Sequence, residues 1–322
     1  MQARHRALLS TRYARITMSI DNTTSDKPAS SPRLQVPGLF KWMVGDMEVT
    51  AVSDGHATFP LSIVPDADPQ EAERLAQAAF LPPGDLPMAI NTYVIRQGTR
   101  TVLVDTGAGG GLGPQAGKQR DNLRAAGIDP ASVDVLFLTH LHPDHILGMT
   151  TQDGTAAFPN AELVLHQREL AYWSDDANMA QGTEFERFLF QSARQAVAAY
   201  AGRTTLLERD EQAVSPGVIA QELPGHTPGH TGLLVASGDG QLLIWGDIIH
   251  LPHLQFVHPE WGVGFDVDPA QTMATRRRML DRVATDRMMV AGMHLDFPGF
   301  GYVGRARDGA YAFVPSPWRH AF

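Results

Sequence analysis

The chain has 322 residues, of which 43% are hydrophobic and 19% are charged, so it is long enough to bury a sizeable core. Its 26 lysines and arginines are outnumbered by 35 aspartates and glutamates, and the resulting net charge of −9 disfavours a nucleic-acid partner. It has no cysteine, which excludes disulfides, thiolate nucleophiles and sulfur-ligated metals and draws attention to its 13 histidines.

The N-terminal segment differs in composition from the rest of the chain. Residues 1–17 carry several arginines but no continuous apolar stretch, so they do not resemble a secretory signal peptide, and Met18 would also serve as a start. Residues 19–37 are rich in Ser, Thr, Pro and Asp, which favours a mobile segment. We expect a disordered or mobile leader over 1–38 and a single folded domain over 39–322. With no apolar run long enough to span a bilayer, we expect a cytoplasmic protein without membrane contact.

Apolar runs and turn residues predict an alternation of strands and helices in the first half of the chain. Asp54-Gly55 is a turn signal that ends the first predicted strand, and Thr183 and Glu186 have the capping-box spacing that begins a helix. The predicted elements are a strand over 47–53, a hairpin over 93–104, a helix over 118–126, strands over 133–138 and 162–165, and a helix over 183–200.

The second half of the chain repeats this design. Asp268 and Pro269 are an N-cap and a first-turn proline that begin a helix continuing through Arg282. The other predicted elements are a strand over 218–223, a hairpin over 233–245 and a strand over 288–290. Clustered strands with interspersed helices predict an α+β fold, an αββα sandwich of two mixed sheets flanked by helices.

A hexapeptide after the predicted strand over 133–138 contains three histidines and an aspartate. It has the pattern H-x-H-x-D-H, formed by His140, His142, Asp144 and His145. Such side chains cannot all be buried at a strand end without partners, and a metal ion provides those partners. The hexapeptide therefore predicts a metal site.

Further candidate ligands stand beside glycines at the ends of later predicted strands. A glycine lets the backbone turn sharply near a metal, and an aspartate can bridge two cations with its two oxygens, which a histidine cannot. These candidates are His226, His230, Asp247 and His294.

The series H-x-H-x-D-H, T-P-G-H-T, G-D and a terminal histidine resembles the dinuclear hydrolase pattern of the metallo-β-lactamase superfamily. Within it, segments 45–55, 105–109 and 294–299 look like the methyl parathion hydrolase branch and its lactonase relatives. The resemblance extends from about residue 43 to about residue 315 and implies two divalent cations and a homodimer. Cysteine-ligated lactamases, redox flavodiiron proteins and tRNA-processing nucleases are disfavoured by the absence of cysteine, by His142 and by the negative charge, respectively.

The resemblance also assigns ligands. His226 is not a ligand in the family and is expected to be structural or to support the ligands. Asp54 and Asp105 either orient ligand histidines through the second ring N–H or cap turns. The implied ligand sets are His140, His142 and His230 for one cation, Asp144, His145 and His294 for the other, and Asp247 as the bridge.

The chemistry implied by the resemblance is hydrolysis by a hydroxide that bridges the two cations and attacks a carbonyl carbon or phosphorus. Asp144 would carry the proton to the leaving group. Nitrogen and oxygen ligands favour zinc, while manganese, cobalt and iron remain alternatives.

Substrate preference is expected to depend on His250, three residues beyond Asp247. The lactonases that open acyl-homoserine lactones typically have tyrosine there, and methyl parathion hydrolases have leucine. A histidine can donate a hydrogen bond or protonate an alkoxide, which favours a lactone or ester, unless His250 is simply a buried, hydrogen-bonded residue. We expect lactone or ester hydrolysis, with phosphotriester hydrolysis as the alternative and a non-catalytic metal sensor as a third reading.

Apolar side chains in segments that line the pocket of the resembling enzymes are candidates to bind an acyl chain or aryl group. Ordinary core packing is the alternative for each of them. The candidates are Phe59, Leu61, Leu112, Trp173, Phe188 and Trp261.

Overall fold

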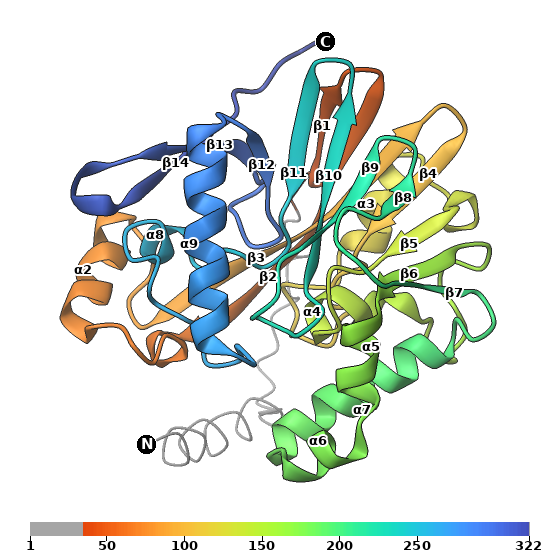
Figure 1. Ribbon diagram of the computed structural model, residues 1–322, viewed down its shortest axis with the longest axis horizontal. Helices are drawn as coiled ribbons and strands as arrows, with labels where there is room; N and C mark the ends of the chain where they lie inside the picture. Colours follow the sequence, from red (N-terminus) through yellow and green to blue (C-terminus); the bar gives the residue numbers. More distant parts are fainter. Residues whose placement is uncertain (1–34, 322) are drawn as a thin grey trace, which may run out of the picture.

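The computed structural model describes residues 35–321 (Figure 1). Most of the predicted leader, residues 1–34, lies outside the described residues, so the division into a leader and a single domain stays a prediction. Within the described part of the chain, no helix is long and apolar enough to cross a membrane.

The first half of the described chain forms a seven-stranded mixed sheet. Strands β1 to β4 pair antiparallel in chain order, and β4 to β7 pair in parallel. Its strands are β1 (Leu39–Val44), β2 (Met47–Pro60), β3 (Asp85–Gln97), β4 (Arg100–Val104), β5 (Val135–Phe137), β6 (Glu162–His166) and β7 (Thr204–Leu207).

The second half forms another seven-stranded sheet, in which the strands again follow chain order. All its neighbours pair antiparallel except β11 and β12, which are parallel. Its strands are β8 (Ala213–Ser215), β9 (Val218–Glu222), β10 (Thr231–Ser237), β11 (Gly240–Ile244), β12 (Met289–Ala291), β13 (Phe300–Arg305) and β14 (Tyr311–Pro315).

Helices cover the outer faces of the two sheets. Figure 1 shows α9 in blue beside β12 and β13, and α5, α6 and α7 in green below β6 and β7. The α-helices are α2 (Pro69–Ala78), α3 (Gln119–Ala125), α4 (Pro143–Ile146), α5 (Gln167–Ser174), α6 (Asp176–Gln181), α7 (Glu184–Ala198), α8 (Pro252–Gln255) and α9 (Pro269–Thr285), and the 3-10 helices are η1 (Leu61–Ile63), η2 (Pro130–Ser132), η3 (Leu147–Met149) and η4 (Arg307–Gly309).

Three apolar layers hold this arrangement together. The central layer lies between the sheets, where Val104 and Phe137 of the first sheet belong to one cluster with Val235 and Ile244 of the second. A second cluster joins the outer face of the first sheet to α7, and a third joins the outer face of the second sheet to α9. The order helix, sheet, sheet, helix confirms the predicted αββα sandwich.

The capping residues predicted from the sequence begin the two longest helices, α7 and α9. Other elements differ from the prediction. The capping box of Thr183 and Glu186 is present at the start of α7. The predicted strand end at Asp54-Gly55 is wrong, because the register shifts there and β2 continues to Pro60. Gly55 adopts φ 105° within this irregularity, so its conformational freedom bends the strand instead of ending it. The elements that were not predicted are strands β1, β7, β8, β13 and β14 and helices α2, α4, α5, α6 and α8.

The topology gathers several loops at one edge of the sandwich. Parallel β4 and β5 end before Asp105 and His140, and parallel β11 and β12 end before Asp247 and His294. Because parallel strands point the same way, the loops that follow them lie together. His230 lies immediately before β10, in the loop that leads into it.

Candidate metal centre

Asp247 lies at the middle of the cluster formed by these loops. Its side chain is buried, and one oxygen, Oδ2, faces ring nitrogens from both halves of the chain, while Oδ1 has no hydrogen-bond partner among the described residues. The Nε2 atoms near Oδ2 are those of His294 at 2.9 Å, His250 at 3.1 Å, His145 at 3.3 Å, His226 at 3.4 Å and His140 at 3.7 Å.

One donor group adjoins Asp247 on the side of Asp144. Oδ2 of Asp144 lies 3.4 Å from Nε2 of His145 and 3.4 Å from Nε2 of His294. These three residues form one group whose donor atoms are close enough to share an ion. The set agrees with the grouping that the resemblance implied for one cation.

A second donor group is built of imidazoles alone. Nδ1 of His142 lies 3.1 Å from Nε2 of His140 and 2.9 Å from Nε2 of His226. These three rings form another group able to hold an ion. His226, which was expected only to support the ligands, therefore lies among the donor atoms.

His230, the predicted third histidine of this set, has both ring nitrogens engaged. Its Nδ1 donates to the Leu223 carbonyl at 2.8 Å, and its Nε2 accepts the Asp247 backbone N–H at 2.9 Å. In the described part of the chain, His230 belongs to none of the groups of three mutually close donors, although its ring centroid lies 5.3 Å from that of His140.

Neighbouring groups fix the orientation of several rings. Nδ1 of His145 donates to Asp105 Oδ2 at 2.7 Å, and Nδ1 of His294 donates to the Ala89 carbonyl at 2.7 Å. Both rings then present Nε2, the atom with which each would bind a metal, toward the cluster.

Asp54, the other carboxylate predicted to orient a ligand, has a different role. Its oxygens accept the backbone N–H groups of Ala108 at 2.8 Å, Gly117 at 3.0 Å and Gln119 at 2.8 Å. It therefore fixes the loop that follows Asp105, while Asp105 itself contacts the ring of His145.

Electrostatics divide the rings into two classes. Burial, together with neighbouring rings, lowers the pKa of His140, His142 and His226 well below the usual histidine value, so these rings are neutral. Burial also opposes charge on His145, but the surrounding carboxylates, Asp247 foremost, outweigh it and raise the pKa of His145 well above the usual value. The carboxylates thus stabilise positive charge within the cluster, whether a ring proton or a metal ion carries it.

The donor set fits divalent cations. Nε2 of His145, Oδ1 of Asp247 and both ring nitrogens of His250 are buried without a hydrogen-bond partner among the described residues. Unpaired buried polar atoms are costly, and bound cations would satisfy them. Imidazole nitrogens with carboxylate oxygens are ligands that zinc, manganese, cobalt and iron accept.

His250 is placed against both donor groups. It is fully buried, its ring stacks on that of His294 with 5.1 Å between centroids, and it lies 4.6 Å from the ring of His226. Burial lowers the pKa of His250, so the ring is neutral at physiological pH. The predicted catalytic residues Asp144, Asp247 and His250 therefore lie in one cluster.

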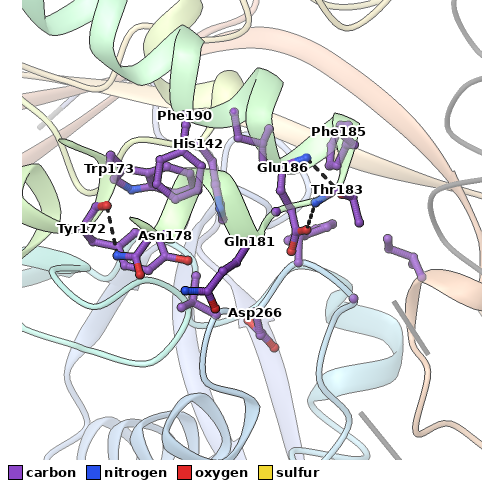
Figure 2. Close-up of a pocket in the computed structure, with 16 residues that line it drawn as sticks. His142, Tyr172, Trp173, Asn178, Gln181, Thr183, Phe185, Glu186, Phe190 and Asp266 are labelled. Carbon is purple, nitrogen blue, oxygen red and sulfur yellow. Dashed lines mark hydrogen bonds between the residues drawn. The ribbon is translucent and has the colours of Figure 1, made fainter. Parts of the chain in front are cut away.

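A cavity of about 190 Å³ opens beside His142. Its walls come from α5, α6, α7 and the loop over 264–267, and Figure 2 shows Trp173 and Phe190 on one side with Asp266 across from them. The edge of His142 meets Trp173 with 5.5 Å between ring centroids. The cavity therefore lies directly against the imidazole donor group.

The six predicted pocket residues occupy different places. Trp173 lines the cavity; Phe59, Leu61 and Trp261 pack together in an apolar cluster; and Leu112 packs beside Phe59 in another. The side chain of Phe188 is 47% exposed and is not among the residues that line the cavity.

Two buried carboxylates support the site without any signal in the sequence. Glu169 accepts hydrogen bonds from Leu141 N and Gly229 N, so it joins the two histidine loops. Asp266 accepts from Nδ1 of His226 at 2.7 Å. Both acids are far from their partners in the chain, and only a complete tertiary structure reveals these contacts.

Comparisons with known proteins agree with this fold. A hydrolase of the beta-lactamase superfamily, AbOPH, is 28% identical with a TM-score of 0.83, and the alignment covers 89% of this chain and 100% of that one. The dizinc quorum-quenching lactonase AidC, solved with an N-hexanoyl-L-homoserine product, is 24% identical with a TM-score of 0.83. The alignment covers 88% of this chain and 99% of AidC. A variant of AiiA from B. thuringiensis, with N-decanoyl-L-homoserine at its active site, is 18% identical with a TM-score of 0.57. The alignment covers 80% of this chain and 100% of the AiiA variant.

The last two likenesses bear on the fold alone, and none of the curated proteins matches the chain significantly. The family comparison is decisive, because the pattern of the metallo-beta-lactamase superfamily matches residues 85–294. That range includes every ligand candidate named above. The chain belongs to the metallo-β-lactamase superfamily and is a hydrolase of that superfamily.

Proposed function

We propose that this protein is a dinuclear metal hydrolase that opens lactones or esters, with acyl-homoserine-lactone-like molecules as the substrate class. The observation that carries the proposal is the arrangement of the two donor groups around Asp247 beside a cavity whose walls combine aromatic and aliphatic side chains with polar ones. We further propose zinc as the metal, a homodimer as the assembly and the cytoplasm as the location, in keeping with the resemblance and the composition.

Bound cations would supply a water acidified enough to ionise near neutral pH and a positive centre for the substrate oxygen. Asp144 remains ionised, because His145 and His294 outweigh its burial and hold its pKa well below the usual value. It can therefore accept a proton and pass it to the leaving oxygen. His250 is neutral and its two ring nitrogens have no hydrogen-bond partner among the described residues, so its ring N–H can donate to the substrate carbonyl or leaving oxygen.

The cavity supports an acyl substrate. Trp173, Leu189 and Phe190 provide apolar surface, and a chain seated against them would extend away from His142. AidC and the N-acyl homoserine lactone hydrolase were solved with N-hexanoyl-L-homoserine products, which consist of such a chain on a polar head. This likeness supports the substrate class proposed for this chain.

Phosphotriester hydrolysis is the second candidate function. The aromatic rings of Trp173, Phe185 and Phe190 in the cavity wall favour it, because they offer flat surfaces to an aryl leaving group. The two candidates share the cations and differ in the group that the cavity holds.

The deciding experiment measures metal content and two activities on a single preparation. Metal per chain is determined by mass spectrometry, and initial rates are measured on a long-chain acyl-homoserine lactone and on a methyl phosphotriester. Two metals with the lactone strongly preferred support the proposal. Two metals with the phosphotriester preferred support the alternative, and two metals with no turnover on these or other esters would favour the sensor.

A further inference from the structure

His250 differs from other buried rings of the cluster in how it is held. Nδ1 of His145 donates to Asp105, and Nδ1 of His294 donates to the Ala89 carbonyl. Neither ring nitrogen of His250 has a hydrogen-bond partner among the described residues, although the side chain is fully buried. The place of this ring therefore depends on packing and on the main chain that carries it.

Packing surrounds the ring of His250 with other rings. It stacks on His294 with 5.1 Å between centroids, lies 4.6 Å from the ring of His226, and meets Phe265 at 5.3 Å with an interplanar angle of 70°. None of these ring contacts is a directional hydrogen bond. The hydrogen bonds that fix His250 are those of its backbone.

Gln255 holds the main chain of His250 directly. Its Oε1 accepts the His250 backbone N–H at 2.7 Å and the Leu251 backbone N–H at 3.1 Å. Gln255 is the last residue of α8, and Leu251, the N-cap of that helix, makes no capping bond with its own side chain. The glutamine therefore satisfies free N–H groups at the start of its own helix, and the same oxygen fixes the residue that carries the ring.

Arg276 on α9 binds three carbonyls of the loop over 248–261. Its Nε donates to the Ile248 carbonyl at 2.7 Å. Its Nη1 donates to the carbonyls of Pro259 at 3.1 Å and Trp261 at 2.9 Å. The planar guanidinium thus holds both ends of the loop on one helix, because its donors point in fixed directions.

The Trp261 carbonyl joins the two anchoring side chains. It accepts Nε2 of Gln255 at 2.9 Å as well as the Arg276 guanidinium. Gln255 and Arg276 are both 0% exposed, so these hydrogen bonds are shielded from solvent and are stronger than they would be at the surface. They form one buried network that runs from α9 through the loop to the backbone of His250.

A fully buried arginine is costly, because a guanidinium removed from water must be hydrogen-bonded and near an opposite charge. Burial lowers the pKa of Arg276, and the Asp266 carboxylate opposes this shift. Every hydrogen bond of the Arg276 side chain within the described part of the chain ends on a carbonyl of the loop over 248–261. The buried charge therefore acts on the loop that carries His250.

We propose that Gln255 and Arg276 are positioning residues for His250, which fix the main chain of its loop so that the ring meets the substrate carbonyl or leaving oxygen in one place. The inference rests on the proposed function for the role of His250 and extends it to two residues outside the donor groups. A displacement of about 1 Å in a group that acts in the transition state can lower a rate about 100-fold. Loss of either anchor is therefore expected to lower the rate.

The first measurement reads the place of His250 without substrate. The full-length protein is labelled with ¹³C at histidine Cε1 and loaded with diamagnetic Zn²⁺, and the NMR signal of His250 is assigned by its loss in His250→Leu. Gln255→Met removes both polar atoms and is expected to shift or broaden that signal. Gln255→Glu, whose carboxyl group still accepts the two N–H groups, is expected to restore it. The matched control is Gln221→Met, which changes a buried glutamine bonded to Ala220 and Arg282 and should leave the signal in place.

The second measurement is a double-variant cycle in kinetics. With the lactone, Gln255→Met is expected to lower kcat by about tenfold and to change KM by less than about threefold, since the lost alignment matters in the transition state. In a His250→Leu background the same substitution should lower kcat by less than about twofold. If circular dichroism shows that Gln255→Met does not fold, Arg276→Lys, which keeps the charge but lacks the planar fork, replaces it in both measurements.

The proposal is supported if the His250 signal moves in Gln255→Met, returns in Gln255→Glu, and the effect on kcat disappears in the absence of His250. It is overturned if the signal stays in place. Equal losses of kcat with and without His250 also overturn it, because a merely structural role does not depend on that ring.

These outcomes separate the inference from the proposed function. If the protein hydrolyses none of the test substrates, the proposed function fails, and the His250 signal alone decides the inference. A lactonase whose His250 signal does not respond to Gln255→Met contradicts the positioning role and leaves the lactonase intact.

Discussion

The Asp105 carboxylate holds the ring of His145 in one orientation, with Oδ2 2.7 Å from Nδ1. Asp105 directly follows β4 and adopts φ 60°, a left-handed conformation that aspartate and asparagine tolerate better than most residues. Its other oxygen accepts the Thr139 backbone N–H at 2.8 Å, so one side chain fixes both the start of the H-x-H-x-D-H loop and the direction of a candidate ligand.

Asp105→Asn is expected to weaken one metal site while preserving the backbone. The amide nitrogen would donate to Nδ1 of His145 and force the ring proton onto Nε2, which blocks the donor atom. We expect metal affinity at one site to fall by about 10–100-fold, measured by competition with a chromophoric chelator. Asp54→Asn is the contrast, because Asp54 bonds only backbone N–H groups; equal metal loss in both variants would contradict this role.

Asp247→Ala is expected to abolish most turnover and to release at least one metal. The carboxylate faces ring nitrogens of both donor groups, and its loss leaves both without their shared anion. The rate should fall by at least about 1,000-fold, with metal per chain measured on the same sample. A variant that keeps the full rate with one metal would end the two-cation proposal.

His250→Leu is expected to separate the two candidate activities. It removes the N–H available to a carbonyl or leaving oxygen, so kcat/KM for the lactone should fall by about 100-fold, while phosphotriester turnover is spared or raised. Both rates are compared at equal metal content. The opposite pattern would remove His250 from the chemistry.

Glu169→Gln is expected to lower the free energy of unfolding, because Glu169 connects the two loops that carry the histidines. Oε1 of Glu169 accepts Leu141 N and Trp173 Nε1, and Oε2 accepts Thr227 Oγ1 and Gly229 N. The amide group of glutamine would turn at least one of these contacts into facing donors, since Gly229 N cannot accept, and would lower the free energy of unfolding by about 1–3 kcal/mol. Denaturant unfolding with and without metal checks this, and exposed Glu208→Gln should change the free energy by less than about 0.5 kcal/mol.

Leu189→Phe is expected to shorten the acyl chain that the protein accepts. Leu189 on α7 lines the cavity, and a larger side chain would fill part of its volume. KM for a long-chain lactone should rise by about tenfold and KM for a short-chain lactone should change much less. Phe188→Ala is the neighbouring control, because Phe188 is largely exposed and not among the residues lining the cavity; an equal effect would place the acyl chain elsewhere.

Local patterns in the sequence were sufficient for most strands, for helices α3, α7 and α9, and for the chemistry of the donors. Capping residues act within one helical turn, so the starts of α7 and α9 were predictable from Thr183 and Asp268. The spacing of the H-x-H-x-D-H motif fixed which side chains share a loop. Gly55 was misread because a glycine with positive φ serves both turns and strand irregularities, and only pairing with β3 distinguishes the two.

The sequence by itself was enough to predict an αββα hydrolase with nitrogen and oxygen donors for metal ions, because those signals are residue types and short spacings. Only the tertiary structure decided which side chains support them. Glu169 reaches Thr227 and Gly229 across 58 and 60 residues, and His226 meets Asp266 across 40. Such contacts depend on how the two sheets pack, and no local rule of spacing encodes the relative placement of segments that are distant in the chain.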